Sequence, residues 1–323
     1  MSRRLISTSR SEMSRMTARQ LKQSIQASEG RVVLCQTYVD LPPLCEGTLN
    51  AELAQAFGAD MIFLNGYSLD AAWEHKGLQA EVWDRGKFQT RQLRLQELKK
   101  WIDVPLGIYL ECGDGDDLTT STAPNHKLVR KDRVATKENL LKARQEGVDF
   151  IILGGNPGTG TSFSRIVEAA RSAKQLLGDS VLIFAGKWED GVTQKVLGDP
   201  TLAQGESEAF IKDLIDAGAD VICLPMPGSR QAINVEDIRS LVTFAHTYKP
   251  GTLAMTFLDG SVEGADEATI RQCALWSKMT GADIHAIGDA GMSGVSIPED
   301  IYAMSIALKG RRLTFRRLAT HHR

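Results

Sequence analysis

Short runs of apolar and β-branched residues recur along the chain, and each is followed by a longer amphipathic stretch. Such alternation is typical of parallel strands joined by crossover helices. Eight runs fit this pattern, at residues 32–39, 61–65, 106–111, 150–154, 181–187, 221–225, 253–258 and 284–288. Each run is therefore predicted to be a strand of one parallel sheet.

A repeated Gly-x-Asp pattern introduces four of these runs, at Gly58-Ala59-Asp60, Gly147-Val148-Asp149, Gly218-Ala219-Asp220 and Gly281-Ala282-Asp283. Glycine supplies the left-handed cap that ends a helix before the next strand. An open doubly wound sheet usually has fewer strands and a glycine-rich first turn, which does not follow Val39. We therefore predict an α/β fold, a single (β/α)8 TIM barrel over residues 31–308.

The two ends of the chain lie outside the predicted barrel. Residues 1–30 form an N-terminal arm with a helix over residues 18–28, in which Thr17 is the N-cap and Gln20 completes a capping box. This helix is expected to plug or flank the bottom of the barrel. Residues 309–323 form a basic C-terminal tail that we expect to be solvated or to bridge subunits; its cations are Lys309, Arg311, Arg312, Arg316 and Arg317.

Two βα loops are longer than usual, the loop after strand 2 (residues 66–90) and the loop after strand 3 (residues 112–135). Long loops at the catalytic face of a barrel are typical of lids. Exposed Trp residues such as Trp73 and Trp83 are also typical of interfaces, so contacts within a homo-oligomer are the alternative. His75 lies in the first of these loops.

Composition narrows the class of ligand. The net charge is −2 and the pI is about 6.3, so no overall field favours nucleic acid or a membrane surface. Five widely spaced cysteines form no C-x-x-C pair, and no stretch approaches the about 18 apolar residues of a membrane span. We expect a cytoplasmic protein whose partner is a small molecule.

A glycine-rich turn follows the last predicted strand, Gly288-Asp289-Ala290-Gly291-Met292-Ser293-Gly294, and Pro298 then starts a helix that is expected to end near Leu308. Converging backbone N–H groups and a helix N-terminus bind phosphate in many barrels. Asp259-Gly260, after strand 7, would form the other half of this phosphate cup, although Asp259 repels phosphate unless it faces away. The alternative is a turn that needs its glycines only for geometry.

Two further loops could bind substrate. Gly154-Gly155-Asn156-Pro157-Gly158-Thr159-Gly160-Thr161 follows strand 4 and precedes a helix, so it could hold a carboxylate, a hydroxyl-rich group or a second phosphate. Pro225-Met226-Pro227-Gly228-Ser229, after strand 6, could instead simply shape the rim. Asn65, at the end of strand 2, and Asn156 could orient substrate hydroxyls.

Lys187 ends strand 5, where its amine would point into the barrel mouth. An amine that loses solvation there can act as a base or form a Schiff base with a carbonyl. The alternative is a permanently charged partner for a substrate phosphate or for Glu111.

Glu111 ends strand 3 and is the best-placed carboxylate for proton transfer or for Mg²⁺, with Asp114 as a second candidate ligand. The acidic cluster that contains Asp114 could equally be a hydrated loop tip. His285 is the third candidate for catalysis, but it lies within strand 8, where a core histidine is the alternative. No cofactor other than Mg²⁺ is expected.

Several segments together resemble a bacterial barrel family whose members carry the labels haloacid dehalogenase-like hydrolase or phosphoenolpyruvate phosphonomutase-like. The resemblance spans nearly the whole chain, through residues 50–61, 155–160, 185–187, 263–266 and 282–291. It implies a barrel and phospho-sugar or phospho-acid metabolism. The hydrolase label lacks its D-x-D-x-T or V motif, because Leu118 stands in the last place. The phosphonomutase catalytic Lys-Lys-Cys-Gly-His loop is also missing, so no mechanism is carried across.

We therefore predict a lyase of aldolase type, or an isomerase, in phosphorylated sugar or hydroxy-acid metabolism. The alternatives are an Mg²⁺-dependent enzyme resembling phosphoenolpyruvate mutase and a barrel that binds a phosphorylated metabolite without catalysis. Convergence of Lys187, Glu111 and His285 on one mouth would favour the enzyme.

Overall fold

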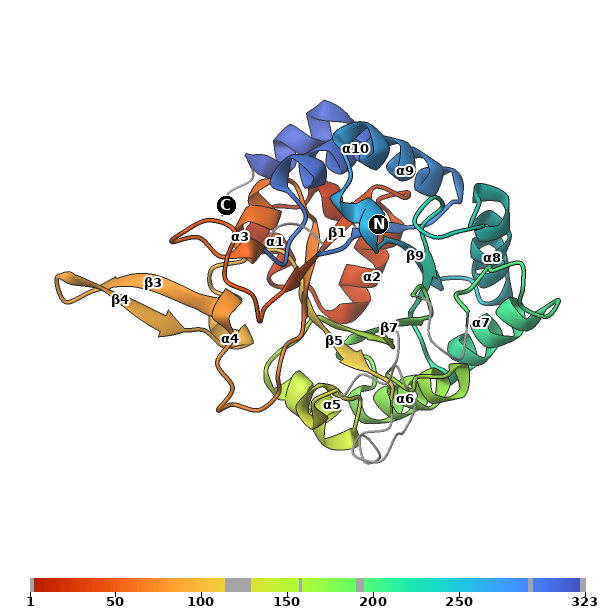
Figure 1. Ribbon diagram of the computed structural model, residues 1–323, viewed down its shortest axis with the longest axis horizontal. Helices are drawn as coiled ribbons and strands as arrows, with labels where there is room; N and C mark the ends of the chain where they lie inside the picture. The colour runs from red at the N-terminus through yellow and green to blue at the C-terminus, as the bar shows by residue number, and fades with distance from the viewer. Residues whose placement is uncertain (1–2, 114–128, 157–158, 190–194, 290–292, 320–323) are drawn as a thin grey trace.

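Eight parallel strands close into one barrel in the order β1-β2-β5-β6-β7-β8-β9-β10 (Figure 1). We obtained this fold from a computed structural model, which describes residues 3–113, 129–156, 159–189, 195–289 and 293–319. The predicted closed barrel is confirmed, and the ends of only three strands differ from prediction, by one residue each. The strands are β1 (Val32–Tyr38), β2 (Met61–Asn65), β5 (Leu106–Glu111), β6 (Phe150–Gly154), β7 (Leu182–Gly186), β8 (Val221–Pro225), β9 (Leu253–Leu258) and β10 (Ile284–Ile287).

Amphipathic helices surround the barrel and bury their apolar faces against it. Side-chain caps fix several helix starts: Ser162, Asn234 and Asp266 each accept a hydrogen bond from the backbone three residues on. The described helices are α1 (Arg10–Met13), α2 (Ala18–Gln26), α3 (Asn50–Ala56), α4 (Leu95–Leu98), α5 (Lys137–Gln145), α6 (Phe163–Leu177), α7 (Glu206–Ala217), α8 (Val235–Tyr248), α9 (Glu267–Met279) and α10 (Pro298–Leu318), with 3-10 turns η1 (Leu5–Ser7), η2 (Lys76–Leu78), η3 (Lys131–Arg133) and η4 (Ser261–Gly264).

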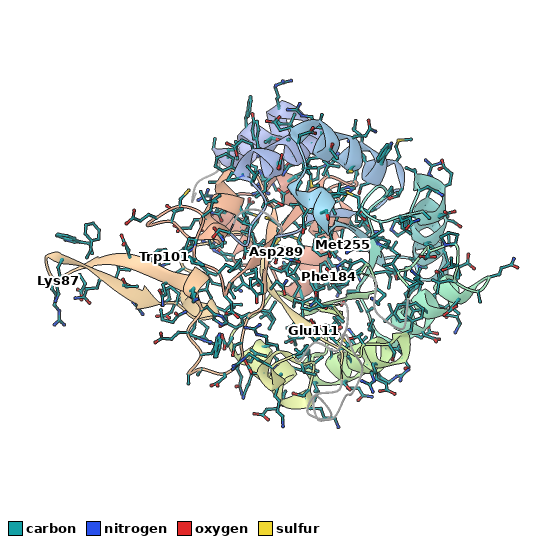
Figure 2. The ribbon with its side chains drawn as sticks, in the orientation of Figure 1. Lys87, Trp101, Glu111, Phe184, Met255 and Asp289 are labelled. Atoms are coloured by element: carbon teal, nitrogen blue, oxygen red, sulfur yellow. The ribbon has the colours of Figure 1, made fainter. Side chains whose placement is uncertain are left out.

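The inside of the barrel is a packed core. Phe63 of β2 and Phe257 of β9 come from strands that are not neighbours, yet their ring centroids lie 5.8 Å apart, so they meet inside the barrel. Phe184 and Met255 also lie within the ring of strands (Figure 2). Because side chains fill the interior, a ligand site must lie above this core, at the end where the strands finish.

The four Gly-x-Asp patterns make one structural device, repeated around the barrel. Each Asp carboxylate accepts a hydrogen bond from a backbone N–H of the preceding barrel strand. The four bonds are Val33 to Asp60 (3.0 Å), Leu106 to Asp149 (2.8 Å), Ile183 to Asp220 (3.2 Å) and Ala254 to Asp283 (2.9 Å). In return, each Asp backbone N–H donates to the carbonyl of the same residue, at 2.8 to 2.9 Å. We call these bonds the aspartate clamps; they join β1 to β2, β5 to β6, β7 to β8 and β9 to β10.

Every clamp also holds a basic side chain, but the four differ in burial. Asp60 pairs with Lys309 and Arg317, and all three side chains are buried. The other three carboxylates are partly exposed and pair with Lys99, Lys22 and His246. Burial opposes ionisation of Asp60, but its two cations outweigh that effect and lower its pKa.

The N-terminal helix follows the prediction. Thr17 caps α2, and the Gln20 side-chain oxygen accepts a hydrogen bond from the Thr17 backbone N–H at 2.9 Å, which completes the capping box. Lys22 of this helix pairs with Asp220 at the start of β8, at 2.7 Å. The helix thus covers the end of the barrel at which the strands begin, opposite the candidate site.

The prediction of a solvated basic tail is wrong for two of its five cations. Helix α10 continues past Leu308 to Leu318, with a kink at Gly310, where φ is 72°. Lys309 and Arg317 are buried against Asp60, and Arg317 also donates to the carbonyl of Leu5. Because a buried carboxylate recruits them, these cations anchor the N-terminal arm to the barrel, while Arg311, Arg312 and Arg316 are exposed.

The long loop after β2 contains a two-stranded antiparallel hairpin of β3 (Gln79–Asp84) and β4 (Lys87–Gln92), separate from the barrel sheet. The hairpin projects sideways from the ring of strands and does not lie over it (Figure 1). This part of the loop is therefore not the lid that the sequence suggested. Most of the loop after β5 lies outside the described residues.

Candidate active site

Glu111, at the end of β5, lies within the barrel ring and is the centre of a buried hydrogen-bond cluster (Figure 2). Its Oε2 accepts from the backbone N–H of Asn156 at 3.0 Å, from Tyr109 at 3.3 Å and from Thr159 at 3.4 Å. The Asn156 side-chain amide donates to Oε1. The predicted residues Glu111, Asn156 and Thr159 are thus brought together.

Burial raises the pKa of Glu111, and the hydrogen bonds from Asn156, Tyr109 and Thr159 offset only part of that effect. A carboxyl group with a raised pKa at the end of a barrel strand is a candidate for proton transfer.

Lys187 directly follows β7 and is only 1% exposed. Its amine donates a hydrogen bond to the carbonyl of Glu189, two residues on. The backbone carbonyl of Lys187 is held by the N–H of Leu197 at 3.0 Å. Its burial after the end of β7 keeps this amine out of bulk water, as the sequence predicts. Its catalytic role stays a prediction.

Glu189, Asp259 and Arg230 form a second charged cluster, from the ends of β7 and β9 and the loop after β8. Arg230 Nη2 lies 3.6 Å from Asp259 Oδ2 and 4.0 Å from Glu189 Oε1. Burial raises the pKa of Glu189 well above its usual range, and its hydrogen bond to Asp259 and the charge of Asp259 add to the rise. Both effects favour the neutral form of the Glu189 carboxyl group.

A third group of polar residues joins β1, β2 and β10. Asn65, at the end of β2, donates to Asp289 Oδ2 at 3.1 Å. Burial raises the pKa of Asp289; hydrogen bonds from Gln36 and Asn65 oppose the rise, and the nearby charge of Asp259 adds to it. Asp289 lies inside the barrel ring, as Glu111 does (Figure 2).

Aromatic side chains support these groups. Trp188 contacts Tyr109 and Phe257 edge-on, at ring-centroid distances of 6.0 and 5.5 Å. Among described residues the buried Trp188 Nε1 has no hydrogen-bond partner. The site therefore combines a buried amine, a guanidinium and three carboxyl groups with raised pKa values, and it lies next to packed aromatic side chains. These groups belong to Lys187, Arg230, Glu111, Glu189 and Asp289. Such a set can bind an anionic carbonyl compound and move its protons.

The predicted phosphate cup contains carboxylates. Asp259, at the end of β9, contacts Arg230 and Glu189, and its charge also acts on Asp289 after β10. Gly288 leaves room for Glu263, because a Cβ at position 288 would overlap the Glu263 carboxylate. Ser293 donates to the carbonyl of Pro42 at 2.6 Å, and Gly294 accepts from Tyr38 at 2.7 Å. Gly291 lies outside the described residues, and Gly260 has a φ of 81°.

The glycines of the second predicted nest have packing roles. A Cβ on Gly154 would lie 2.7 Å from the Trp188 ring, and a Cβ on Gly155 would overlap Thr161. Gly158 lies outside the described residues. In the third loop, Gly228 has a φ of 87° and Ser229 donates to the carbonyl of Met226 at 2.7 Å. Ser229 is thus used to form its own turn.

His285 does not reach the mouth, contrary to its predicted role. It is the second residue of β10, and its Nε2 lies 3.0 Å from the carbonyl oxygen of Gly30, before β1 begins. Its Nδ1 contacts Ser277 of α9, outside the barrel. Burial lowers its pKa to about 4. His285 is therefore a core histidine between β10 and α9, which was the alternative interpretation.

The described residues contain no group of three side chains arranged to hold a metal ion. Both oxygens of Glu111, one predicted Mg²⁺ ligand, accept hydrogen bonds from the protein. Asp114, the other predicted ligand, lies outside the described residues. Mg²⁺ binding stays a prediction.

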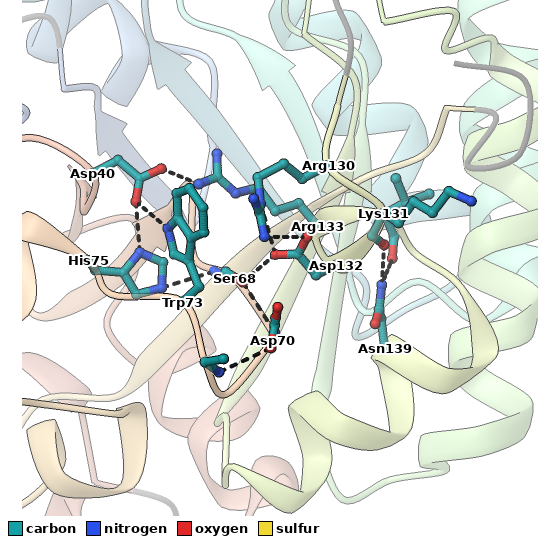
Figure 3. Close-up of polar contacts among 12 residues, drawn as sticks. Asp40, Ser68, Asp70, Trp73, His75, Arg130, Lys131, Asp132, Arg133 and Asn139 are labelled. Atoms are coloured by element: carbon teal, nitrogen blue, oxygen red, sulfur yellow. Dashed lines mark hydrogen bonds and ion pairs between the residues drawn. The ribbon is translucent and has the colours of Figure 1, made fainter. Parts of the chain in front are cut away.

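A polar network beside the mouth resembles a nucleophilic triad in composition only (Figure 3). His75 Nε2 accepts from the backbone N–H of Ser68 at 3.1 Å, so its Nδ1 donates to Asp40 at 2.8 Å. The Ser68 hydroxyl donates to Asp132 instead of His75. Arg133 also contacts Asp40. The network ties the loops after β1, β2 and β5 together, and its histidine is not bonded to the serine hydroxyl.

The sequence interpretation missed Glu189, Arg230, Glu263, Gln36 and Trp188. Glu189 and Trp188 follow Lys187 directly, so their closeness to a strand end was an available signal. Gln36 is a polar residue in an apolar strand, which was a second signal. Arg230 and Glu263 lie in loops, and no spacing in the sequence indicates that they return to the mouth.

A family model described as a domain of unknown function, DUF7916, matches residues 6–323. An archaeal fructose 1,6-bisphosphate aldolase has a TM-score of 0.50 at 13% identity, covering 88% of this chain and 96% of that chain. The carboxyl transferase domain of Rhizobium etli pyruvate carboxylase has a TM-score of 0.52 at 13% identity, covering 96% of this chain and 51% of that chain. Phosphonopyruvate hydrolase in complex with oxalate and Mg²⁺ has a TM-score of 0.49 at 14% identity, covering 85% and 81%.

At these identities the likeness concerns the barrel fold alone. No curated protein matches the chain in sequence. In the described part of the chain, none of the helices has both the length and the apolar character needed to cross a membrane.

Proposed function

The chain belongs to the DUF7916 family, whose description assigns no activity, and we propose that its barrel is a lyase of aldolase type or an isomerase. The observation that carries this proposal is the buried Lys187 amine after β7, which donates to the backbone carbonyl of Glu189, a residue whose own carboxyl group is buried with a raised pKa. An amine and an acid at one site are the groups that carbonyl chemistry requires.

In the proposed reaction, the neutral amine of Lys187 attacks a substrate carbonyl carbon. The carbonyl oxygen takes one proton from the attacking nitrogen and a second from Glu189, and it leaves as water when the protonated Schiff base forms. The protonated Schiff base then withdraws electrons from the adjacent carbon, so that a carbon–carbon bond breaks or a proton is lost. Asp259, the carboxylate partner of Glu189, accepts that proton.

Arg230 is the proposed contact for the anionic group of the substrate. Its side chain is the cation beside the Glu189–Asp259 pair, and among described residues its buried Nε has no hydrogen-bond partner. The loops after β9 and β10 present Asp259, Glu263 and Asp289, which would repel a phosphate. We therefore place the carboxylate or phosphate of the substrate near Arg230 and not in the predicted cup.

The experiment uses carbonyl probes, because the natural substrate is not needed to test the amine. We expect borohydride with pyruvate or dihydroxyacetone phosphate to trap an adduct at Lys187, detected by mass spectrometry. The enzyme should also exchange the probe's α-protons in D₂O, followed by NMR. Lys187→Met should abolish the adduct and slow exchange by about 100-fold or more, the scale for losing a proton-transfer group.

Lys249→Met, at the opposite end of the barrel, is the matched control and should behave as the parent does. Glu189→Gln should form the adduct slowly, because its amide cannot protonate the leaving oxygen. Thermal stabilisation by the probes with neither adduct nor exchange would support the non-catalytic binding barrel. Exchange that needs Mg²⁺ and persists in Lys187→Met would support the mutase-like alternative.

A further inference from the structure

The β3–β4 hairpin has the form of an arm. Its two-residue turn, Arg85-Gly86, has φ values of 48° and 82°, as type I′ hairpin turns require. Each strand has six residues, which corresponds to about 20 Å at roughly 3.3 Å per residue. The tip, marked by Lys87, lies far from the barrel ring (Figure 2).

The arm exposes its aromatic residues. Trp83 and Phe88 stand directly opposite each other, and their ring centroids are 4.9 Å apart. They are 65% and 71% exposed, more than any other large apolar side chain of the described residues. An isolated two-stranded hairpin is only marginally stable in water, so this aromatic pair needs a surface that covers it.

A groove of about 380 Å³ between α6 and α7 has the complementary chemistry. Phe163 and Phe210 line it and stack with their ring centroids 4.1 Å apart. Three carboxylates surround these rings, Glu168, Glu206 and Asp213, against the single cation Arg171. The tip of the arm carries the opposite balance, with Arg85 and Lys87 against Asp84.

We propose that the arm of one copy of this chain docks in the α6–α7 groove of a second copy. Trp83 and Phe88 cover the half-buried Phe163, which stacks on the buried Phe210, and the cations of the tip approach the carboxylates of the groove. Aromatic side chains that fill a pocket are typical anchors of protein interfaces. Charge complementarity selects this groove over the apolar surface of α9, which includes Leu275, Trp276 and Met279.

Each copy has one arm and one groove, so two copies that exchange arms form a closed dimer. If the geometry does not allow that exchange, the same contact joins copies head to tail, into a ring where the rotation closes and into a filament where it does not.

The experiment reverses charges on each side of the contact and measures the oligomeric state by analytical ultracentrifugation. The arm variant is Arg85→Glu/Lys87→Glu, and the groove variant is Glu168→Lys/Asp213→Lys. Each variant alone should be monomeric at concentrations where the parent is an oligomer, and an equimolar mixture of the two should associate again. Arg311→Glu/Arg312→Glu changes charge equally on exposed α10 residues and should leave the oligomer intact.

A monomeric parent would overturn the proposal. So would an arm variant that stays oligomeric, or a groove variant that does, because the arm would then rest elsewhere, for example on α9. Two monomeric variants that fail to associate when mixed would show that the two surfaces do not meet. Circular dichroism and melting temperature check that both variants keep the parent fold. The arm lies outside the proposed active site, so neither variant should alter borohydride trapping at Lys187.

Discussion

Buried ionisable residues have two different roles in this protein, and the charge of the neighbouring side chains distinguishes them. Asp60 is buried against two cations, so it stays ionised and holds structure together. Burial, together with the neighbouring carboxyl group of Asp259, raises the pKa of Glu189. The first arrangement stabilises a charge, whereas the second favours a proton-bearing acid of the kind that catalytic sites use.

The aspartate clamps permit a matched test of a buried charge. Asp60→Asn retains an acceptor for the Val33 N–H but leaves Lys309 and Arg317 buried without a counter-charge, which should cost about 3–5 kcal/mol. The equivalent change Asp220→Asn faces only the partly exposed Lys22 and should cost about 1 kcal/mol. Urea unfolding of both variants measures the difference. Equal costs would show that the backbone bond, and not the ion pair, determines the contribution of each clamp.

At the scale of single residues, the sequence predicts those functional groups that directly follow a strand. Glu111, Asn65 and Lys187 lie at the mouth because a strand end fixes their position. Arg230 and Glu263 reach the mouth through loops whose path depends on packing, so spacing alone does not place them. For His285 the strand was correct, but periodicity does not say whether a position faces the barrel interior or the surrounding helices.

Among the elements, strands were predicted almost to the residue, because each is an apolar run bounded by glycine or charged residues. The hairpin was missed because most of its side chains are exposed, so that no buried face produces an apolar period. The second half of α10 was mistaken for a tail for a related reason. Its cations look solvated in the sequence, and only the burial of Asp60 explains them.

Removal of the predicted tail tests its corrected role. A chain that ends at residue 308 lacks both Lys309 and Arg317, so Asp60 becomes a buried charge without a partner. We expect a loss of stability of at least about 3 kcal/mol, seen as a strongly lowered melting temperature or as failure to fold. A chain that lacks only residues 320–323 is the control and should melt as the parent does. A truncated chain as stable as that control would restore the interpretation of a solvated tail.

On the scale of the whole molecule, the closed barrel followed from counting strand and helix units, and the comparisons agree with it. The assembly could not be derived in the same way. The exposure of Trp83 and Phe88 and the shape of the α6–α7 groove are properties of folded surfaces, and neither leaves a periodic trace in the sequence.

The four aspartate clamps divide the barrel unevenly. They reinforce alternate strand pairs, while the seams β2–β5, β6–β7, β8–β9 and β10–β1 carry no such carboxylate among the residues that the structure describes. The ring is thus four two-strand modules joined edge to edge. In hydrogen exchange at low denaturant, amides at module seams, such as Ile62 and Leu253, should open before the clamped amides of Val33 and Ile183. Simultaneous opening of all eight strand pairings, clamped and unclamped, would instead mean that the barrel has no modules and opens as one cooperative unit.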